Sequence, residues 1–216
     1  MNGQRLVGRT LRGKWRIDAL LGEGGMASVY AATHRNGSRG AVKILHAHVA
    51  ADPKLRARFV REGYVANRVE HPGVVRVIDD DVTEDGAVFL VMELLRGETW
   101  RARWVASGRR LSALDVVTTA IEVADILAAA HGSGVVHRDV KPDNVFLVEG
   151  GGVKLLDFGI ARLRDAGFEA TATEAMLGTP AYMSPEQALS RWSEVDGRSD
   201  LFALGASVWT LMTGTL

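Results

Sequence analysis

The segment His137–Asn144 constrains the fold of this chain more than any other stretch. It reads His-Arg-Asp-Val-Lys-Pro-Asp-Asn, and Asp157-Phe158-Gly159 begins thirteen residues after it ends. An acid, a lysine and an amide thus stand within six residues, and a second acid is expected one β-hairpin further on. Such groups are suited to holding a divalent metal ion and to polarising a hydroxyl group. We therefore expect a fold that brings the second acid beside this segment.

Composition is that of an ordinary soluble protein with no bulk electrostatic preference. The chain has 216 residues, enough for one domain or two small lobes, with 47% hydrophobic and 24% charged residues. Its formal net charge is zero, which favours neither nucleic acid nor an anionic membrane as a partner. Any affinity for phosphate must come from a local site. Cysteine is absent, which excludes disulfides and thiolate metal sites and fits a cytoplasmic location.

Neither end of the chain is predicted to enter a membrane. Met1–Lys14 is basic and polar, without the apolar core of a signal peptide. The apolar run Leu201–Leu216 is shorter than a bilayer span and contains glycine, serine and threonine. We expect it to form a buried helix.

A glycine-rich segment follows the first predicted strand. Trp15–Leu21 is expected to be that strand, and it continues into Gly22-Glu23-Gly24-Gly25-Met26-Ala27-Ser28-Val29. Glycines let a backbone approach a phosphate closely because they carry no side chain. Taken alone, the segment could equally be a bare turn between two strands.

The residues after these glycines separate the known kinds of nucleotide-binding loop. Ser28–Ala32 is predicted to be a strand rather than a helix, so neither a Rossmann unit nor a Walker loop fits. Gly40–Leu45 is then a third strand, in which Lys43 is the one charged residue of an apolar run. Lys43 is either an edge-strand lysine that extends to water or a phosphate-binding lysine.

Further elements are predicted from caps and periodicity. Asp52-Pro53 is typical of a helix start, and this helix should end at His71-Pro72. Strands are expected at Val74–Ile78 and Ala87–Met92, joined by an acidic turn. A longer helix should begin at Ser112 and end at Gly132. Its apolar residues at helical spacing, expected to pack in the core, are Leu114, Val117, Ile121, Ala124 and Ala128.

These motifs together resemble those of one family. The His-Arg-Asp-x-x-x-x-Asn and Asp-Phe-Gly motifs, with the glycine-rich loop and Lys43, are similar to the signature of the protein kinases. From about residue 10 to its last residue, the chain resembles the eukaryotic-like (Hanks-type) serine/threonine kinases of bacteria. The resemblance implies an α+β, bilobal fold. Residues 1–95 would form a small antiparallel β lobe with one helix, and residues 96–216 a mainly helical large lobe without its C-terminal helices.

The resemblance also implies roles for individual residues. Asp139 would orient a substrate hydroxyl and accept its proton, Lys141 would neutralise charge on the transferred group, and Asn144 would complete the catalytic set. Asn144 and Asp157 would hold Mg²⁺ or Mn²⁺. The ATP-binding residues would be Leu21, Gly22, Glu23, Gly24, Gly25, Met26, Ala27, Ser28, Val29, Ala41, Lys43, Glu62, Met92, Glu93, Leu95, Phe146 and Asp157.

Within that set the resemblance assigns specific contacts. Lys43 would pair with Glu62, although Glu62 could instead form a surface pair with Arg58. Met92 would be the gatekeeper residue, and the backbones of Glu93 and Leu95 would meet the adenine. Ala27 replaces the third glycine of the family pattern.

Residues 141–182 indicate which hydroxyl groups would accept phosphate and how the activity would be regulated. Lys141, together with Gly178-Thr179-Pro180-Ala181-Tyr182, resembles the serine/threonine branch, in which Thr179 would contact Asp139. Autophosphorylation is expected at Thr171 or Thr173, with the phosphate pairing with Arg138 and Arg162.

Two acids near the end of the chain have expected contacts as well. Asp200 should accept hydrogen bonds from the backbone of His137 and Arg138. Glu186 should be unpaired, because the family's arginine partner would lie in the missing helices.

Three functions follow from these expectations. The first is an ATP-dependent kinase acting on Ser/Thr residues of proteins, with a homodimer conceivable for autophosphorylation and no nucleic-acid partner. The second is a nucleotide-binding regulatory module with little catalysis, favoured by the absent C-terminal helices. The third is a kinase-fold enzyme that acts on small molecules.

Overall fold

The structure, a computed structural model, describes residues 6–158 and 180–215, except for the side chain of Glu62. The chain divides into a small unit, Met1–Tyr64 with Arg76–Leu95, and a large unit, Val65–Val75 with Arg96–Leu216. The sequence-based division assigns residues 65–75 to the small lobe, whereas here they belong to the large unit. The reason is burial, because Ala66, Val69 and Val74 pack into the large unit's hydrophobic core.

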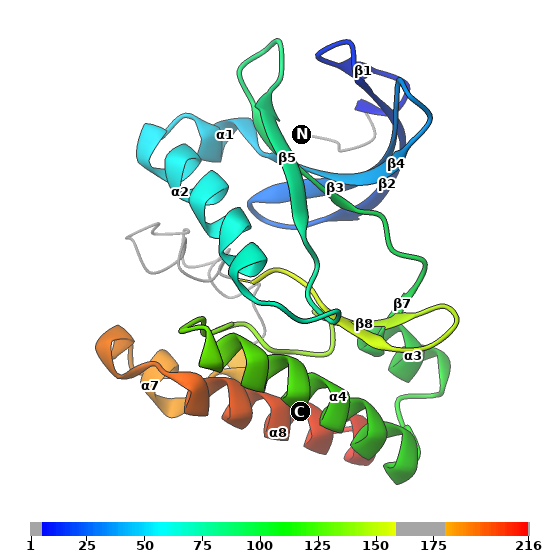
Figure 1. Ribbon diagram of the computed structural model, residues 1–216. Coiled ribbons are helices and arrows are strands. Elements are labelled where there is room, and N and C mark those ends of the chain that lie inside the picture. Colours follow the sequence, from blue (N-terminus) through cyan, green and yellow to red (C-terminus); the bar gives the residue numbers. More distant parts are fainter. Residues whose placement is uncertain (1–5, 159–179, 216) are drawn as a thin grey trace. The chain divides into compact units, whose positions relative to one another are not determined.

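The small unit is built on a six-stranded antiparallel sheet (Figure 1). Its strands lie in the order β1-β2-β3-β4-β6-β5. Their bounds are Thr10–Leu11 for β1, Trp15–Glu23 for β2, Ala27–His34 for β3, Arg39–Leu45 for β4, Val77–Val82 for β5 and Val88–Glu93 for β6. The glycine-rich segment therefore joins two antiparallel strands, as the sequence predicts.

Alternation along the strands separates two faces of this sheet. One face carries the core cluster, which includes Tyr30, Val42 and Val91. The other carries Val29 and Lys43, which are cross-strand partners and therefore point to the same side. Lys43 thus belongs to a central strand and lies on the face opposite to that core, so the edge-strand interpretation of Lys43 is wrong.

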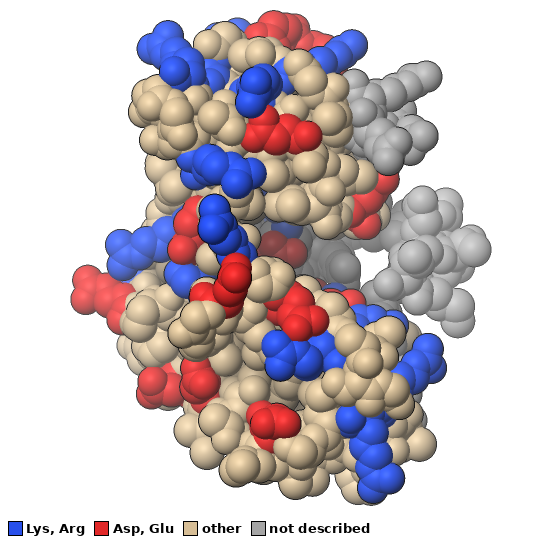
Figure 2. All heavy atoms as spheres, turned by 90° about the vertical axis from the view of Figure 1, so that its right-hand side faces the viewer, with Lys and Arg blue, Asp and Glu red and all other residues tan. Residues whose placement is uncertain are grey.

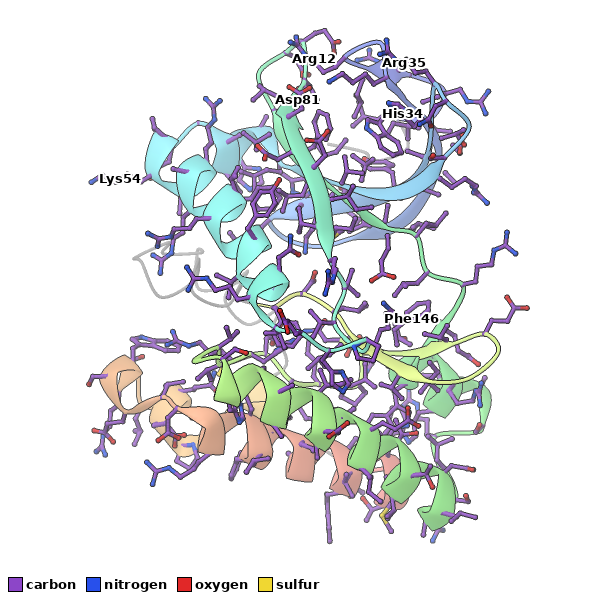
Figure 3. The ribbon with its side chains drawn as sticks, in the orientation of Figure 1. Arg12, His34, Arg35, Lys54, Asp81 and Phe146 are labelled. Atoms are coloured by element: carbon purple, nitrogen blue, oxygen red, sulfur yellow. The ribbon has the colours of Figure 1, made fainter. Side chains whose placement is uncertain are left out.

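The predicted strand Val74–Ile78 is displaced along the chain. The observed strand β5 spans Val77–Val82, so that Asp79, Asp80 and Asp81 lie in the strand rather than in a turn. An edge strand has one side free of strand partners, and its aspartates remain in contact with water. In Figure 3, Asp81 lies beside Arg12, whose Nε is 3.6 Å from the Asp81 carboxylate.

Two helices complete the small unit, α1 at Ala47–Ala50 and α2 at Pro53–Gly63. The start of α2 is as predicted, but the α-helix ends at Gly63 and continues only as the 3-10 helix η2, Tyr64–Arg68. A Cβ atom at Gly63 would lie 2.4 Å from Cδ1 of Leu90 on β6. A side chain at this position would have to displace the buried Leu90 side chain, so glycine suits this close approach of helix and sheet.

The large unit contains a three-stranded sheet and a pair of long helices (Figure 1). The sheet has the order β7-β8-β9, with strands at Gly97–Thr99, Val145–Val148 and Val153–Leu155. The helices are α3 at Trp100–Ala106, α4 at Ala113–Gly132, α7 at Pro185–Ala188 and α8 at Gly197–Thr213. Short 3-10 helices occur at Pro180–Tyr182 (η3) and Trp192–Glu194 (η4). Helices α4 and α8 pack against each other.

Helix α4 begins as predicted but buries a different face. Ser112 is its N-cap and accepts a hydrogen bond from the backbone N–H of Asp115. Leu114 and Ile121, expected in the core, are 77% and 65% exposed. The buried residues are instead Val116, Val123, Ile126, Leu127 and Ala130. The helix is apolar on more than one side, so periodicity alone did not determine which side is covered.

On the face shown in Figure 2, Lys and Arg side chains are interspersed with Asp and Glu side chains. This pattern agrees with the zero net charge of the sequence. Among the residues that the structure describes, no helix has both the length and the apolar character needed to cross a membrane.

The three tyrosines of the chain lead to a prediction about alkaline pH. Burial raises the pKa of Tyr30 and of Tyr182, and burial together with the hydrogen bond to Asp80 raises the pKa of Tyr64 to about 12. The unfolded chain ionises tyrosine at about pH 10. The folded state thus favours the neutral phenols, so the contribution of the tyrosines to the free energy of unfolding should be constant below about pH 10 and should fall as pH rises above it.

Spectrophotometric titration of tyrosinate would test this prediction. The tyrosines of the folded chain should ionise at higher pH than those of the urea-unfolded chain. Tyr64→Phe should remove the ionisation step at about pH 12. Coincident titration curves for the folded and unfolded chains would contradict it.

Candidate functional site

The hairpin β8-β9 brings the two predicted metal-binding residues to the same end of the sheet. Val145 pairs with Leu155, so the residues that flank this pair, Asn144 and Leu156, also lie opposite each other. The backbone N–H of Leu156 donates to the carbonyl of Asn144 at 2.8 Å. Asp157 follows directly. Local strand pairing thus explains why an amide and an acid thirteen residues apart lie at neighbouring positions.

The carboxylate of Asp139 is held by two side chains from its own loop. Lys141 Nζ lies 3.0 Å and 2.8 Å from its two oxygens, and Asn144 Nδ2 lies 3.0 Å from Oδ2. Asn144 Nδ2 also donates to the backbone carbonyl of Asp139 at 2.7 Å. The structure therefore brings together Asp139, Lys141 and Asn144, the three residues predicted to be catalytic.

His137 fixes the start of the loop through both nitrogens of its ring. Nε2 lies 2.7 Å from the carbonyl oxygen of Leu156, and Nδ1 lies 3.2 Å from the backbone nitrogen of Asp139. A carbonyl only accepts and a backbone N–H only donates, so the ring is neutral with its hydrogen on Nε2. The ring also packs edge-on against Phe158, with centroids 4.6 Å apart. His137 thereby links the loop of Asp139 to the segment that carries Asp157.

Asp200 binds the backbone of the same loop at His137 and Arg138, as the sequence predicts. It is fully buried in the first turn of α8. Its Oδ2 accepts from the backbone N–H of His137 at 2.9 Å, and Oδ1 accepts from that of Arg138 at 2.7 Å. His131 Nε2, on α4, lies 2.8 Å from Oδ2. A buried carboxylate thus satisfies two loop amides and one ring nitrogen.

Two residues of the site have left-handed backbone conformations. Arg138 has a φ of 70° and Asp157 a φ of 61°, although neither is glycine. Such conformations cost about 1–3 kcal/mol and persist only where surrounding contacts impose them. The hydrogen bond that the backbone N–H of Arg138 donates to Asp200 and the packing of His137 against Phe158 are such contacts.

One contributor to the site was missed by the sequence analysis. Gln187 Nε2 donates to the backbone carbonyl of Arg138 at 2.8 Å, and Gln187 Oε1 accepts from the backbone N–H of Ser184 at 3.2 Å. Ser184 and Gln187 have the spacing of a capping box, and the structure shows one at the start of α7. That spacing could have indicated the helix start, although not the contact with Arg138.

Glu186 is not unpaired, contrary to expectation. The hydroxyl of Ser199 donates to its carboxylate, and this bond is the main reason that the pKa of Glu186 lies below its usual value. A hydroxyl at the start of α8 thus takes the place of the cationic partner that the family resemblance implies.

The oxygen groups near this hairpin suit a hard divalent cation. Asn144 uses Nδ2 for its bonds to Asp139, which places Oδ1 on the opposite side of the planar amide. With the carboxylate of Asp157, this oxygen matches the donors that Mg²⁺ prefers, and Mg²⁺ commonly takes its remaining ligands from phosphates and water. Within the described ranges, no three His, Cys, Asp or Glu residues gather into a metal site of the protein's own.

In the small unit, the predicted phosphate-binding residues form a row across the sheet. Gly22 pairs with Val29, Val29 with Lys43, and Lys43 with Leu90. Ala41 and Met92 form the next pair along the same face. A Cβ atom at Gly22 or Gly25 would meet nothing within 4 Å, and neither glycine has a left-handed φ. The protein therefore leaves open space at these glycines, which fits the close approach of a ligand.

The remaining predicted residues are distributed between the two units. Leu21, Glu23, Gly24, Met26, Ala27 and Ser28 lie on or beside strands β2 and β3, while Glu93 ends β6 and Leu95 ends the small unit. Phe146 lies on β8 of the large unit (Figure 3).

Several expected contacts cannot be compared with the structure. Glu62 lies on α2, but its side chain is outside the description, so its pairing with Lys43 remains a prediction. Arg162, Thr171, Thr173, Gly178 and Thr179 also lie outside the described residues.

Comparison with known proteins gives consistent matches. Residues 15–216 match the protein kinase domain family. The serine/threonine-protein kinase Pkn1 of Myxococcus xanthus is 47% identical over 209 residues, which are 94% of this chain and 29% of that protein. The probable serine/threonine-protein kinase PknB of Corynebacterium glutamicum is 40% identical over 206 residues, which are 93% of this chain and 31% of that protein.

A solved structure agrees with these matches. The crystal structure of the Mycobacterium tuberculosis PknI kinase domain superposes with a TM-score of 0.74 at 32% identity, covering 96% of this chain and 77% of that one. The chain spans less than a third of the length of the two curated relatives named above.

Proposed function

Because this chain belongs to the protein kinase domain family, we propose that it transfers the γ-phosphoryl group of ATP to serine and threonine hydroxyls of proteins. The observation that carries the proposal is the carboxylate of Asp139, held between Lys141 and Asn144 beside the hairpin that leads to Asp157. Phosphoryl transfer requires positioning and charge stabilisation rather than a covalent enzyme group. This arrangement supplies both.

Asp139 acts on the acceptor in this proposal. Its carboxylate accepts the hydroxyl proton while the hydroxyl oxygen bonds to the γ-phosphorus, and the bond from that phosphorus to the bridging oxygen of ADP breaks. Lys141 holds the carboxylate in place, and its positive charge offsets charge on the transferred group. Asn144 restrains the same carboxylate through Nδ2.

The metal and nucleotide contacts are proposed from the donor groups present. Asn144 and Asp157 would hold Mg²⁺, or Mn²⁺, which neutralises phosphate charge when bound. In the small unit, Lys43 and the backbone of the glycine-rich loop would bind the phosphates of ATP. Glu62 would orient Lys43, and the backbone at Glu93 and Leu95 would bind the adenine.

Acceptors and cellular setting are also proposals. Lys141 two residues after Asp139 supports serine and threonine as acceptors, with the chain's own Thr171 or Thr173 among them through a transient homodimer. The proposed use of ATP and the absence of cysteine favour a cytoplasmic location.

A labelling experiment separates this function from its alternatives. The chain would be incubated with γ-labelled ATP and Mg²⁺, with dephosphorylated casein or with a set of small alcohols and sugars as acceptors. Label in casein, or in the chain itself, supports the protein kinase. Label only in small molecules would support a small-molecule kinase, and tight ATP binding without transfer would support a regulatory module.

The metal role of Asp157 gives a separate prediction. Asp157→Asn removes a charged ligand for Mg²⁺, so the Mg²⁺ concentration for half-maximal ATP binding should rise at least about tenfold. Titration calorimetry at fixed ATP would measure it, with Asp143→Asn, at a half-exposed position paired with Arg101, as a matched control. An unchanged Mg²⁺ requirement in Asp157→Asn would contradict the assignment.

A further inference from the structure

His46, immediately after strand β4, makes three hydrogen bonds to the glycine-rich loop. Its backbone N–H donates to the carbonyl of Met26 at 2.8 Å. Its ring Nδ1 lies 3.2 Å from the carbonyl oxygen of Gly25, and its ring Nε2 lies 2.9 Å from the hydroxyl of Ser28. One residue outside the loop thus contacts three of the four residues from Gly25 to Ser28.

The chemistry of the carbonyl partner determines which ring nitrogen donates to Gly25. A carbonyl oxygen only accepts, so Nδ1 carries a hydrogen and donates it to Gly25. Nε2 of the neutral ring then accepts the hydroxyl hydrogen of Ser28, which is buried on β3. Both ring nitrogens are therefore engaged with the loop, and a side chain with only one polar atom could not replace both bonds.

These bonds orient two consecutive peptide units. Each peptide unit is planar and trans, so its N–H points away from its C=O. The carbonyl of Gly25 shares a unit with the N–H of Met26, and the carbonyl of Met26 shares one with the N–H of Ala27. Because both carbonyls point to His46, the N–H groups of Met26 and Ala27 are both turned away from it.

We propose that His46 is a positioning residue of the kinase reaction, which holds the glycine-rich loop so that the N–H groups of Met26 and Ala27 are directed at the phosphates of ATP. This inference rests on the proposed function, since it takes ATP as the ligand. The loop needs such an anchor because Gly24 and Gly25 allow its backbone many conformations. The family-like glycine pattern does not itself identify the anchor, which is a side chain outside that pattern.

The test compares substitutions of His46 by two readouts. Loss of the ring bonds in His46→Ala should raise the KM for ATP about three- to tenfold while kcat changes less than about twofold. His46→Asn can still donate to Gly25 and should recover part of the loss. His48→Ala, which removes the neighbouring exposed ring 5.7 Å from that of His46, is the matched control and should behave as wild type.

Amide hydrogen exchange without nucleotide separates this inference from the proposed function. In His46→Ala, exchange should quicken at residues 24–28 and stay unchanged in β5 and β6. If exchange at residues 24–28 is faster in His46→Ala but the wild-type chain never binds ATP, the kinase function is refuted while the structural role of His46 in holding the loop stands. Unchanged exchange, an unchanged KM, or an equal effect of His48→Ala would overturn the role of His46.

Discussion

The Asp139→Asn variant is expected to transfer phosphate about 10²- to 10⁴-fold more slowly than the wild-type chain, the range typical of a lost general base. The amide cannot accept the proton of the substrate hydroxyl. It also places an N–H₂ group where Lys141 and Asn144 now donate to oxygen. ATP binding should stay within about threefold of wild type, because the proposed role of Asp139 concerns the acceptor rather than the nucleotide.

Asp143→Asn provides the control for this prediction. Asp143 belongs to the same loop, and its carboxylate forms a half-exposed ion pair with Arg101 at 3.4 Å. Its replacement should change the rate by less than about threefold, as expected for a surface pair. Transfer by Asp139→Asn at the wild-type rate, measured with labelled ATP and casein, would rule out Asp139 as the base.

Asp200→Ala should lower the free energy of unfolding of the large unit by about 3–5 kcal/mol. The substitution leaves the backbone N–H groups of His137 and Arg138 and the ring of His131 without their buried acceptor. The loss of stability in Asp200→Asn should be intermediate, because its single amide oxygen can accept only some of the hydrogen bonds from these two N–H groups and the His131 ring. Chemical denaturation followed by tryptophan fluorescence would measure both variants.

A second acid at the same helix serves as comparison. Asp196 is the N-cap of α8, where its exposed carboxylate accepts from the backbone N–H of Arg198. Asp196→Ala should cost about 1 kcal/mol, the usual value for a lost cap. Equal losses for Asp196→Ala and Asp200→Ala would mean that Asp200 is only another cap and does not hold the catalytic loop.

Short-range features of the site could be predicted from the sequence because local pairing determines them. Asn144 and Asp157 are neighbours because an apolar hairpin lies between them, and the apolar runs that form it are visible in the sequence. The glycine-rich turn was predictable in the same way, since strands of alternating pattern flank it. Asp200 required the family resemblance, because 61 residues of sequence separate it from Asp139.

Features that depend on tertiary packing were not predictable. Helix α4 is apolar on several sides, and its packing against α8 and β9 leaves Val123 buried and Ile121 exposed. The sequence predicts a turn at the acidic run Asp79–Asp81, whereas an edge strand accommodates these residues even though strand propensity disfavours aspartate. His46 carries no signal in its spacing. Its role depends on strand register, which places it beside the loop.

The most direct test of the kinase function is phosphoamino acid analysis after incubation of the chain with γ-labelled ATP and Mg²⁺. Phosphoserine and phosphothreonine should be recovered from the acceptor protein or the chain, both should require Mg²⁺, and neither should form with Asp139→Asn. A folded chain that binds ATP and yields no phosphoamino acid, or one that yields equal amounts with Asp139→Asn, would contradict the account.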